Sequence, residues 1–86
     1  SGDALRDIAS PERLLSSDQV RQTVTDALQS LPEDLRTVIT LREIEGLSYD
    51  EIAEVLGCPV GTVRSRIFRA REVIDNRLKT VLQGID

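Results

Sequence analysis

The chain has no histidine, tryptophan or methionine, and it has one cysteine, one tyrosine and one phenylalanine among its 86 residues. A single cysteine cannot form an internal disulfide, and a zinc site needs several Cys or His ligands, so we expect neither a disulfide nor a metal site. Without histidine, the Ser–His and Cys–His arrangements of nucleophilic catalysis are excluded. The carboxylates are scattered, with no Gly-rich loop beside them, so we predict that the chain is not an enzyme and binds no cofactor.

Long apolar runs are also missing. No stretch approaches the roughly 20 apolar residues of a membrane span, and no signal-peptide pattern opens the sequence. A lone thiol suits a reducing compartment, so we expect a cytoplasmic protein. The length fits one small domain. The scarcity of aromatic residues predicts an aliphatic core of Leu, Ile, Val and Ala, as in compact helical bundles.

The net charge of −4 is unevenly distributed along the chain. Residues 1–59 contain five Arg and twelve Asp or Glu, a balance of −7, whereas residues 60–79 contain six basic and two acidic residues, a balance of +4. A basic helix on an acidic body can lie against phosphate while the body faces away. The alternative is that these arginines only solvate one face of a helix.

Apolar residues at helical spacing predict two helices in the first half of the domain. The first runs from about Asp18 to Gln29 and is capped by Ser16 or Ser17. The second begins after Pro32, which is favourable in a first helical turn, and stops at Gly46.

Two further helices follow. Ser48 and Glu51 have the spacing of a capping box, so the third helix begins there, and Gly57 ends it as a left-handed C-cap. The fourth helix extends from near Pro59 to about Leu82. Nothing in the sequence indicates a strand, and we predict an all-α, four-helix domain.

The fourth helix has two distinct sides when its residues are placed at about 100° intervals. The buried stripe is predicted to consist of Val63, Ile67, Ala70, Ile74, Leu78 and Val81. The opposite side contains Gly61, Ser65, Phe68, Arg69 and Glu72. Arg64 and Arg71 lie on one flank, and Arg66 lies on the other.

Residues 1–15 are polar and weakly periodic. We interpret them as an inter-domain linker that follows a tag remnant at Ser1-Gly2, with at most a helical turn at Pro11–Leu15. Residues 16–86 are assigned to a single domain.

The short turn containing Gly57, between a short and a long helix, is typical of a helix-turn-helix. Ala53 is small enough for the two helices to approach closely, and Val63 supplies the packing contact of the second helix. A second apolar residue usually follows three positions later, but this chain has Arg66 there. We predict that Ile67 makes that packing contact instead. Helical hairpins with a Gly are also common in structural bundles, so spacing alone permits a protein partner as well as DNA.

The outward side of the fourth helix favours DNA. A recognition helix needs small residues at its N-terminus and Arg or polar residues further along. Arg can pair with the O6 and N7 atoms of guanine, and an apolar side chain can contact a thymine methyl group. The residues that meet this demand are Gly61, Thr62, Arg64, Ser65, Phe68 and Arg69, and the amides of residues 60–62 are expected to be free for a phosphate.

Four residues have alternative interpretations. Phe68 either contacts base edges or packs under a loop or against the linker, and Tyr49 either touches a phosphate or anchors the bundle. We interpret Cys58 as a small turn residue rather than a redox sensor, and Glu51 as a capping partner rather than a base reader.

Four segments carry a specific family pattern: LPEDLR at 31–36, LRE at 41–43, GLSY at 46–49 and CPVGTVRSRIFRAREVIDN at 58–76. Through them the chain resembles region 4 of extracytoplasmic-function (ECF) sigma factors, and closely the envelope-stress sigma-E and alginate-regulator group. The resemblance implies a domain that reads the G-then-A-rich −35 promoter element while docked on the flap of the RNA polymerase β subunit. It also implies a membrane-bound anti-sigma factor that holds the domain inactive through its cytoplasmic segment.

The resemblance also implies which residues contact DNA. The positions that would face the −35 bases and their phosphates are Arg64, Ser65, Phe68, Arg69 and Arg71. Arg42, Tyr49 and Thr62 would help to hold the DNA backbone. Region 2, which melts and reads the −10 element, is not among these residues, so we expect promoter recognition without promoter opening.

Three other classes of function differ in what they predict. A DNA-binding module of a response regulator or quorum-sensing activator would dimerise on paired half-sites, with Leu78, Val81 and Leu82 as a possible seam. A protein-interaction module would bind no DNA at any salt concentration. An acid–base enzyme is the remaining alternative.

Overall fold

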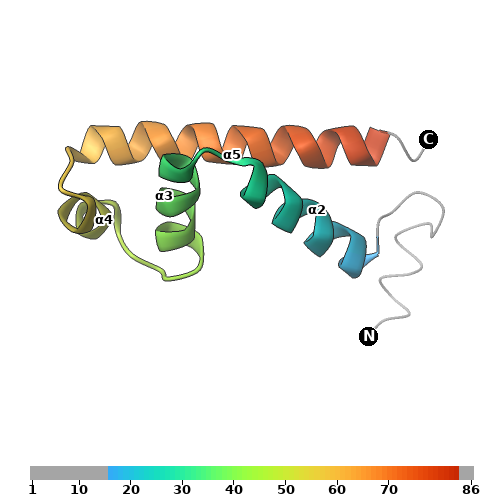
Figure 1. Cartoon of the computed structure of the whole chain (residues 1–86), viewed down its shortest axis with the longest axis horizontal. Helices are drawn as coiled ribbons and strands as arrows, with labels where there is room; N and C mark the ends of the chain where they lie inside the picture. The colour runs from blue at the N-terminus through green and yellow to red at the C-terminus, as the bar shows by residue number, and fades with distance from the viewer. Residues whose placement is uncertain (1–15, 84–86) are drawn as a thin grey trace.

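The computed structural model describes residues 16–83, which form four helices: α2 (Ser17–Ser30), α3 (Glu33–Glu43), α4 (Tyr49–Leu56) and α5 (Val60–Gln83). The other three helices lie along one side of α5: α2 beside its C-terminal half, α3 near its middle and α4 at its N-terminal end (Figure 1). α5 contacts each of them, and α3 also contacts α4. These residues contain no strand, so the predicted all-α fold with a long last helix is confirmed.

Capping boxes begin α2 and α4. In α4 the Ser48 hydroxyl accepts from the Glu51 amide at 3.1 Å, and the Ser48 amide donates to the Glu51 carboxylate at 2.8 Å, as predicted. In α2 the Gln19 amide donates to the Ser16 hydroxyl at 3.1 Å, and the Ser16 amide donates to the Gln19 side-chain oxygen at 2.8 Å. Ser16 is therefore the N-cap of α2. Both pairs satisfy amide groups that the first helical turn leaves without partners.

The Glu51 cap predicts a specific pH dependence. The hydrogen bonds from Ser48, backbone first and hydroxyl second, hold the pKa of Glu51 below its ordinary value. A lowered folded-state pKa stabilises the fold above the unfolded-state pKa of about 4.3, and this contribution is lost as the pH falls through the folded-state value.

We therefore expect acid to destabilise the wild type more than Glu51→Gln, whose amide can cap without titrating. Urea unfolding followed by circular dichroism at neutral pH and at about pH 3, below the ordinary Glu pKa, would measure the difference. Equal losses of stability in the two proteins would show that the cap does not depend on the Glu51 charge.

α3 is shorter than the sequence predicted. It ends at Glu43 rather than continuing to Gly46. The amides of Ile44 and Glu45 both donate to the Thr40 carbonyl, at 3.0 and 3.1 Å, which interrupts the regular ladder. Gly46 then turns the chain with a φ of 76°. The glycine that the sequence predicts as the end of the helix lies instead in the turn that follows it.

The turn of the helix-turn-helix has the predicted form. Gly57 is the C-cap of α4 and has left-handed backbone angles, with φ 67° and ψ 39°. Its own amide donates to the Ala53 carbonyl, and so does the amide of Cys58, at 3.1 Å. A side chain at position 57 would be strained by this φ, so the glycine fixes how the chain leaves α4.

The core is aliphatic and lies where α3 and α4 pack on α5. Val38 of α3, Ile52 of α4 and Val63 of α5 are fully buried, and Ile67 is 1% exposed. Ile67 therefore replaces the usual apolar residue at position 66, as predicted. The rest of the predicted stripe follows α5: Ala70 is buried, and Ile74, Leu78 and Val81 are half-buried.

The predicted linker at residues 1–15, with its turn at Pro11–Leu15, lies outside the described residues. Among residues 16–83, no helix is both long and apolar enough to cross a membrane.

Candidate nucleic-acid interface

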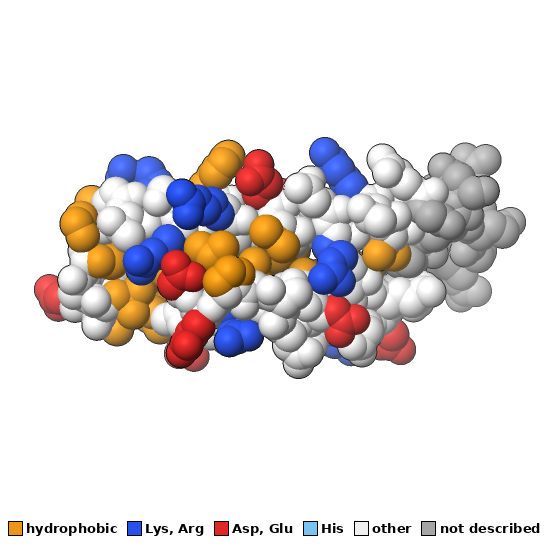
Figure 2. Space-filling model, turned by 45° about the horizontal axis from the view of Figure 1, so that its top comes forward, with side chains coloured by type: hydrophobic (Ala, Val, Ile, Leu, Met, Phe, Trp, Pro, Cys, Tyr) orange, Lys and Arg blue, Asp and Glu red, His pale blue; other side chains and the backbone are white. Residues whose placement is uncertain are grey.

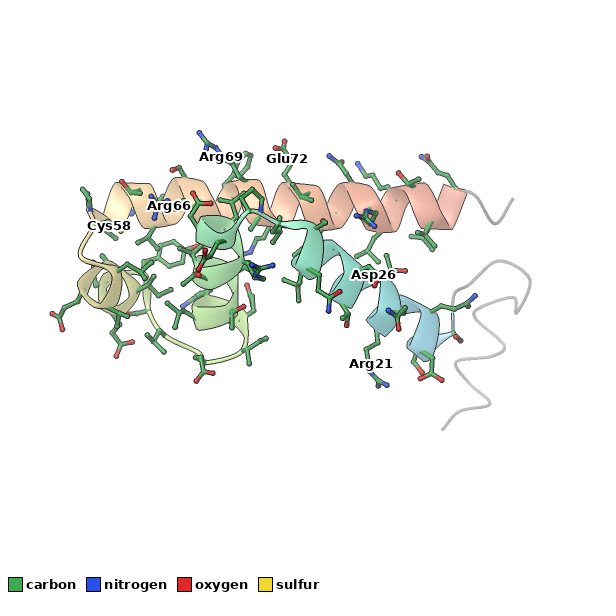
Figure 3. All side chains as sticks on the ribbon, viewed as in Figure 1. Arg21, Asp26, Cys58, Arg66, Arg69 and Glu72 are labelled. Carbon is green, nitrogen blue, oxygen red and sulfur yellow. The ribbon has the colours of Figure 1, made fainter. Side chains whose placement is uncertain are left out.

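The N-terminal half of α5 presents an exposed face opposite the core. Arg64, Ser65, Phe68 and Arg69 are all exposed on it. Arg69 and Glu72 point away from the other three helices (Figure 3). This face turns toward the viewer in Figure 2, where Lys and Arg side chains alternate with hydrophobic and acidic ones. Six of the eight predicted DNA-contacting residues lie on α5, and these four share its outward face.

Phe68 is 68% exposed, although it is the only phenylalanine of the chain. The helices and loops of residues 16–83 do not cover it, so it does not pack under a loop of the described domain. The alternative contact, with the linker, lies outside that part of the chain. A single exposed apolar side chain is normal on a protein surface, and Ile44 and Val55 are similarly exposed, at 67% and 62%. What distinguishes Phe68 is its place next to the exposed Arg64, Ser65 and Arg69.

The first turn of α5 is open to approach. A Cβ atom added at Gly61 would have no heavy atom within 4 Å apart from its chain neighbours and the nearby backbone of α5 itself. Thr62 is half-buried, and its amide donates to the Pro59 carbonyl at 3.0 Å. The prediction that the amides of residues 60–62 are all free for a phosphate was therefore wrong for Thr62. The Ser65 hydroxyl donates to the Thr62 carbonyl at 3.2 Å, and its oxygen can still accept.

Arg71, a predicted DNA contact, is engaged elsewhere. Its guanidinium donates to the carboxylate of Glu43 at the end of α3, with 2.5 Å between Nη2 and Oε1. The two side chains are 47% and 50% exposed. This hydrogen bond is the main reason why the pKa of Arg71 lies above its ordinary value.

Arg66, on the other flank of α5, pairs with Asp34 at the start of α3, with 3.7 Å between Nε and Oδ2. Sequence reasoning assigned partners to neither Arg66 nor Arg71. Both pairs tie α5 to α3 and reduce the positive charge that α5 offers to a ligand. Within residues 16–83, no ion pair involves Arg64 or Arg69.

Arg42 and Tyr49, predicted to hold the DNA backbone, contact each other. Arg42 donates to the Leu47 carbonyl at 2.9 Å, and its guanidinium carbon lies 5.0 Å from the centre of the Tyr49 ring. Tyr49 is half-buried and packs against the core. The ring therefore anchors the bundle, and Arg42 braces the loop that joins α3 to α4. In the described part of the chain, no group of three or more His, Cys, Asp or Glu side chains is arranged to hold a metal ion.

Comparisons with known proteins show the family to which the chain belongs. The family profile for sigma-70, region 4 matches residues 21–74. The ECF RNA polymerase sigma-E factor of Escherichia coli (strain K12) is 59% identical over 83 residues, which cover 96% of this chain and 44% of that protein. The RNA polymerase sigma-H factor of Pseudomonas aeruginosa is 62% identical over 80 residues, covering 93% of this chain and 42% of that protein. The chain thus spans less than half the length of these relatives.

Proposed function

This chain belongs to the sigma-70 region 4 family, and from that membership we propose that it reads the −35 element of promoters as the carboxy-terminal domain of an ECF sigma factor. The observation that carries the proposal is the outward face of α5. Its two arginines without ion pairs in residues 16–83, Arg64 and Arg69, flank an exposed serine and an exposed phenylalanine on a helix whose other side is fixed by the core.

The face matches the requirements of the major groove. The groove admits one α-helix, and Gly61 leaves the start of α5 narrow enough to enter it. In this arrangement Arg64 and Arg69 pair with guanines, and Phe68 contacts thymine methyl groups or base edges. The oxygen of Ser65 accepts from a base or from a water molecule.

The remaining candidates act at the periphery of the DNA contact. Thr62 and Arg71 reach phosphates on the two sides of the groove, and Arg42 does so from the loop before α4. Tyr49 contributes by orienting Arg42. The positions of these side chains around α4 and α5 support a peripheral role, since phosphate contacts fix the register of a recognition helix without reading sequence.

We further propose the partners that this family membership implies. RNA polymerase, through the flap of its β subunit, would carry the domain to the promoter. A membrane-bound anti-sigma factor would hold it inactive through a cytoplasmic segment until envelope stress. The domain would then work in the cytoplasm, as part of a longer chain with further promoter-reading regions.

Fluorescence anisotropy tests the proposed DNA contact. The probes are a duplex with a GGAACTT-type −35 element and a scrambled duplex, at low and moderate salt. We expect wild type to prefer the first duplex, and Arg69→Ala to reduce that preference by about 1–3 kcal/mol, or roughly 5- to 150-fold, because a bidentate guanine contact is lost.

Arg21→Ala is the matched control. It makes the same change of charge on α2, where the Arg21 side chain is 76% exposed. Equal binding of wild type to both duplexes, or an equal loss of preference in Arg21→Ala, would contradict base reading by α5. A protein-interaction module would bind neither duplex at either salt concentration.

A further inference from the structure

Glu43 lies where it can control one of the proposed phosphate contacts. It is the last residue of α3, and its carboxylate holds Arg71 of α5, which is 28 residues further along the chain. About half of each side chain is exposed, so both remain accessible to solvent and to an approaching DNA strand. An ion pair of this kind contributes little to stability, because water competes for both groups. Replacing the Glu43 carboxylate on Arg71 by another anion therefore costs little free energy.

The surroundings of Arg71 are acidic. Besides Glu43, the shallow hollows next to Arg71 have two acidic lining residues, Glu72 and Asp75, and one other basic lining residue, Lys79. Arg64 and Arg69 have no ion pair in the described residues and need no partner exchange before binding DNA. Of the three arginines proposed to contact DNA from α5, only Arg71 must first leave a carboxylate.

Building on the proposed function, we propose that Glu43 limits the affinity of the domain for DNA by competing with a phosphate for Arg71. A guanidinium binds carboxylate and phosphate with the same planar set of donors, so the two ligands exclude each other on that edge. Because a phosphate contact carries no sequence information, Glu43 lowers the affinity for all duplexes alike and leaves the choice of bases to Arg64 and Arg69.

The test is Glu43→Gln, which keeps the shape of the side chain and removes its charge. We expect the specific and the scrambled duplex to bind more tightly by similar factors, roughly two- to fivefold, the range for one exposed ionic contact. A plot of the logarithm of the binding constant against the logarithm of salt concentration should steepen by up to about 0.9, since the wild-type Glu43 carboxylate takes up a cation when it releases Arg71 and so offsets the cation that the phosphate releases. A purely structural role of Glu43 would not change this slope.

Two controls separate the mechanism from simpler effects. Glu45→Gln removes the same charge two positions away at an exposed site, and it should give a smaller gain and no change of slope. In an Arg71→Ala background, Glu43→Gln should give almost no gain, because the residue acts through Arg71. Circular dichroism melting verifies that each variant is folded.

Three results would overturn the proposal. Weaker binding by Glu43→Gln would mean that Glu43 orients Arg71 for DNA. A gain that persists without Arg71 would mean simple repulsion of phosphate by Glu43, and an equal gain in Glu45→Gln would mean a general effect of net charge. Failure of the proposed function gives a different result. Wild type would then bind the −35 duplex and the scrambled duplex equally, or Arg69→Ala would leave its preference for the −35 duplex unchanged.

Discussion

Ile67→Ala is expected to lower the free energy of unfolding by about 2–5 kcal/mol, the usual cost of truncating a buried Ile. Ile67 is 1% exposed and lies in the N-terminal half of α5, within the cluster that also contains Val38 of α3 and Ile52 of α4. The loss combines transfer of the removed methyl and methylene groups with the cavity left between three helices. Single domains have only about 5–15 kcal/mol of stability, so this one change removes a large part of it.

The measurement is urea unfolding followed by far-ultraviolet circular dichroism, which suits a helical protein without tryptophan. Ile44→Ala is the matched control, since the same atoms are removed from a residue that is 67% exposed. We expect its effect to stay within about 0.5 kcal/mol. Similar losses in the two variants would mean that the junction of α3, α4 and α5 is not the stabilising core.

The double substitution Arg64→Ala/Arg69→Ala is expected to abolish the preference for the −35 duplex over the scrambled one. Each bidentate guanine contact supplies about 1–3 kcal/mol of discrimination, so the pair accounts for about 2–6 kcal/mol. Both side chains are exposed and have no ion pair among residues 16–83, so the free energy of unfolding should change little. Competition anisotropy with the two duplexes at one salt concentration measures the preference directly.

Arg77→Ala/Lys79→Ala is the control for this prediction. It removes the same two positive charges from exposed positions in the C-terminal half of α5. We expect it to weaken binding to both duplexes slightly and to leave the preference intact. If both double variants lose the preference equally, the selectivity comes from the overall positive charge of α5 and not from base contacts. Binding of two chains per duplex would instead favour the activator-type module that dimerises on half-sites.

Local signals in the sequence determined the four helices and most of their ends. The capping box at Ser48 and Glu51 and the left-handed Gly57 involve residues only a few positions apart, so the sequence alone contains their geometry. The helical period likewise identified Ile67 as the buried residue and placed Phe68 away from the apolar stripe, but only the structure shows that Phe68 is exposed. Prediction failed at the end of α3, because Gly46 serves equally well in a turn after a helix and at a helix end.

The tertiary structure alone decided which arginines of α5 remain available to a ligand. Arg66 and Arg71 project from flanks of α5, where the helical period leaves burial undecided, and their partners Asp34 and Glu43 belong to α3. Such pairs exist only because α3 crosses α5 at one particular place, and that place is set by how their apolar stripes interlock. The sequence by itself therefore determined the helices and the outward face with Arg64 and Arg69. The positive charge that remains on that face depends on the ion pairs of Arg66 and Arg71, whose partners lie about 30 positions earlier in the chain. No local sequence pattern encodes such distant contacts.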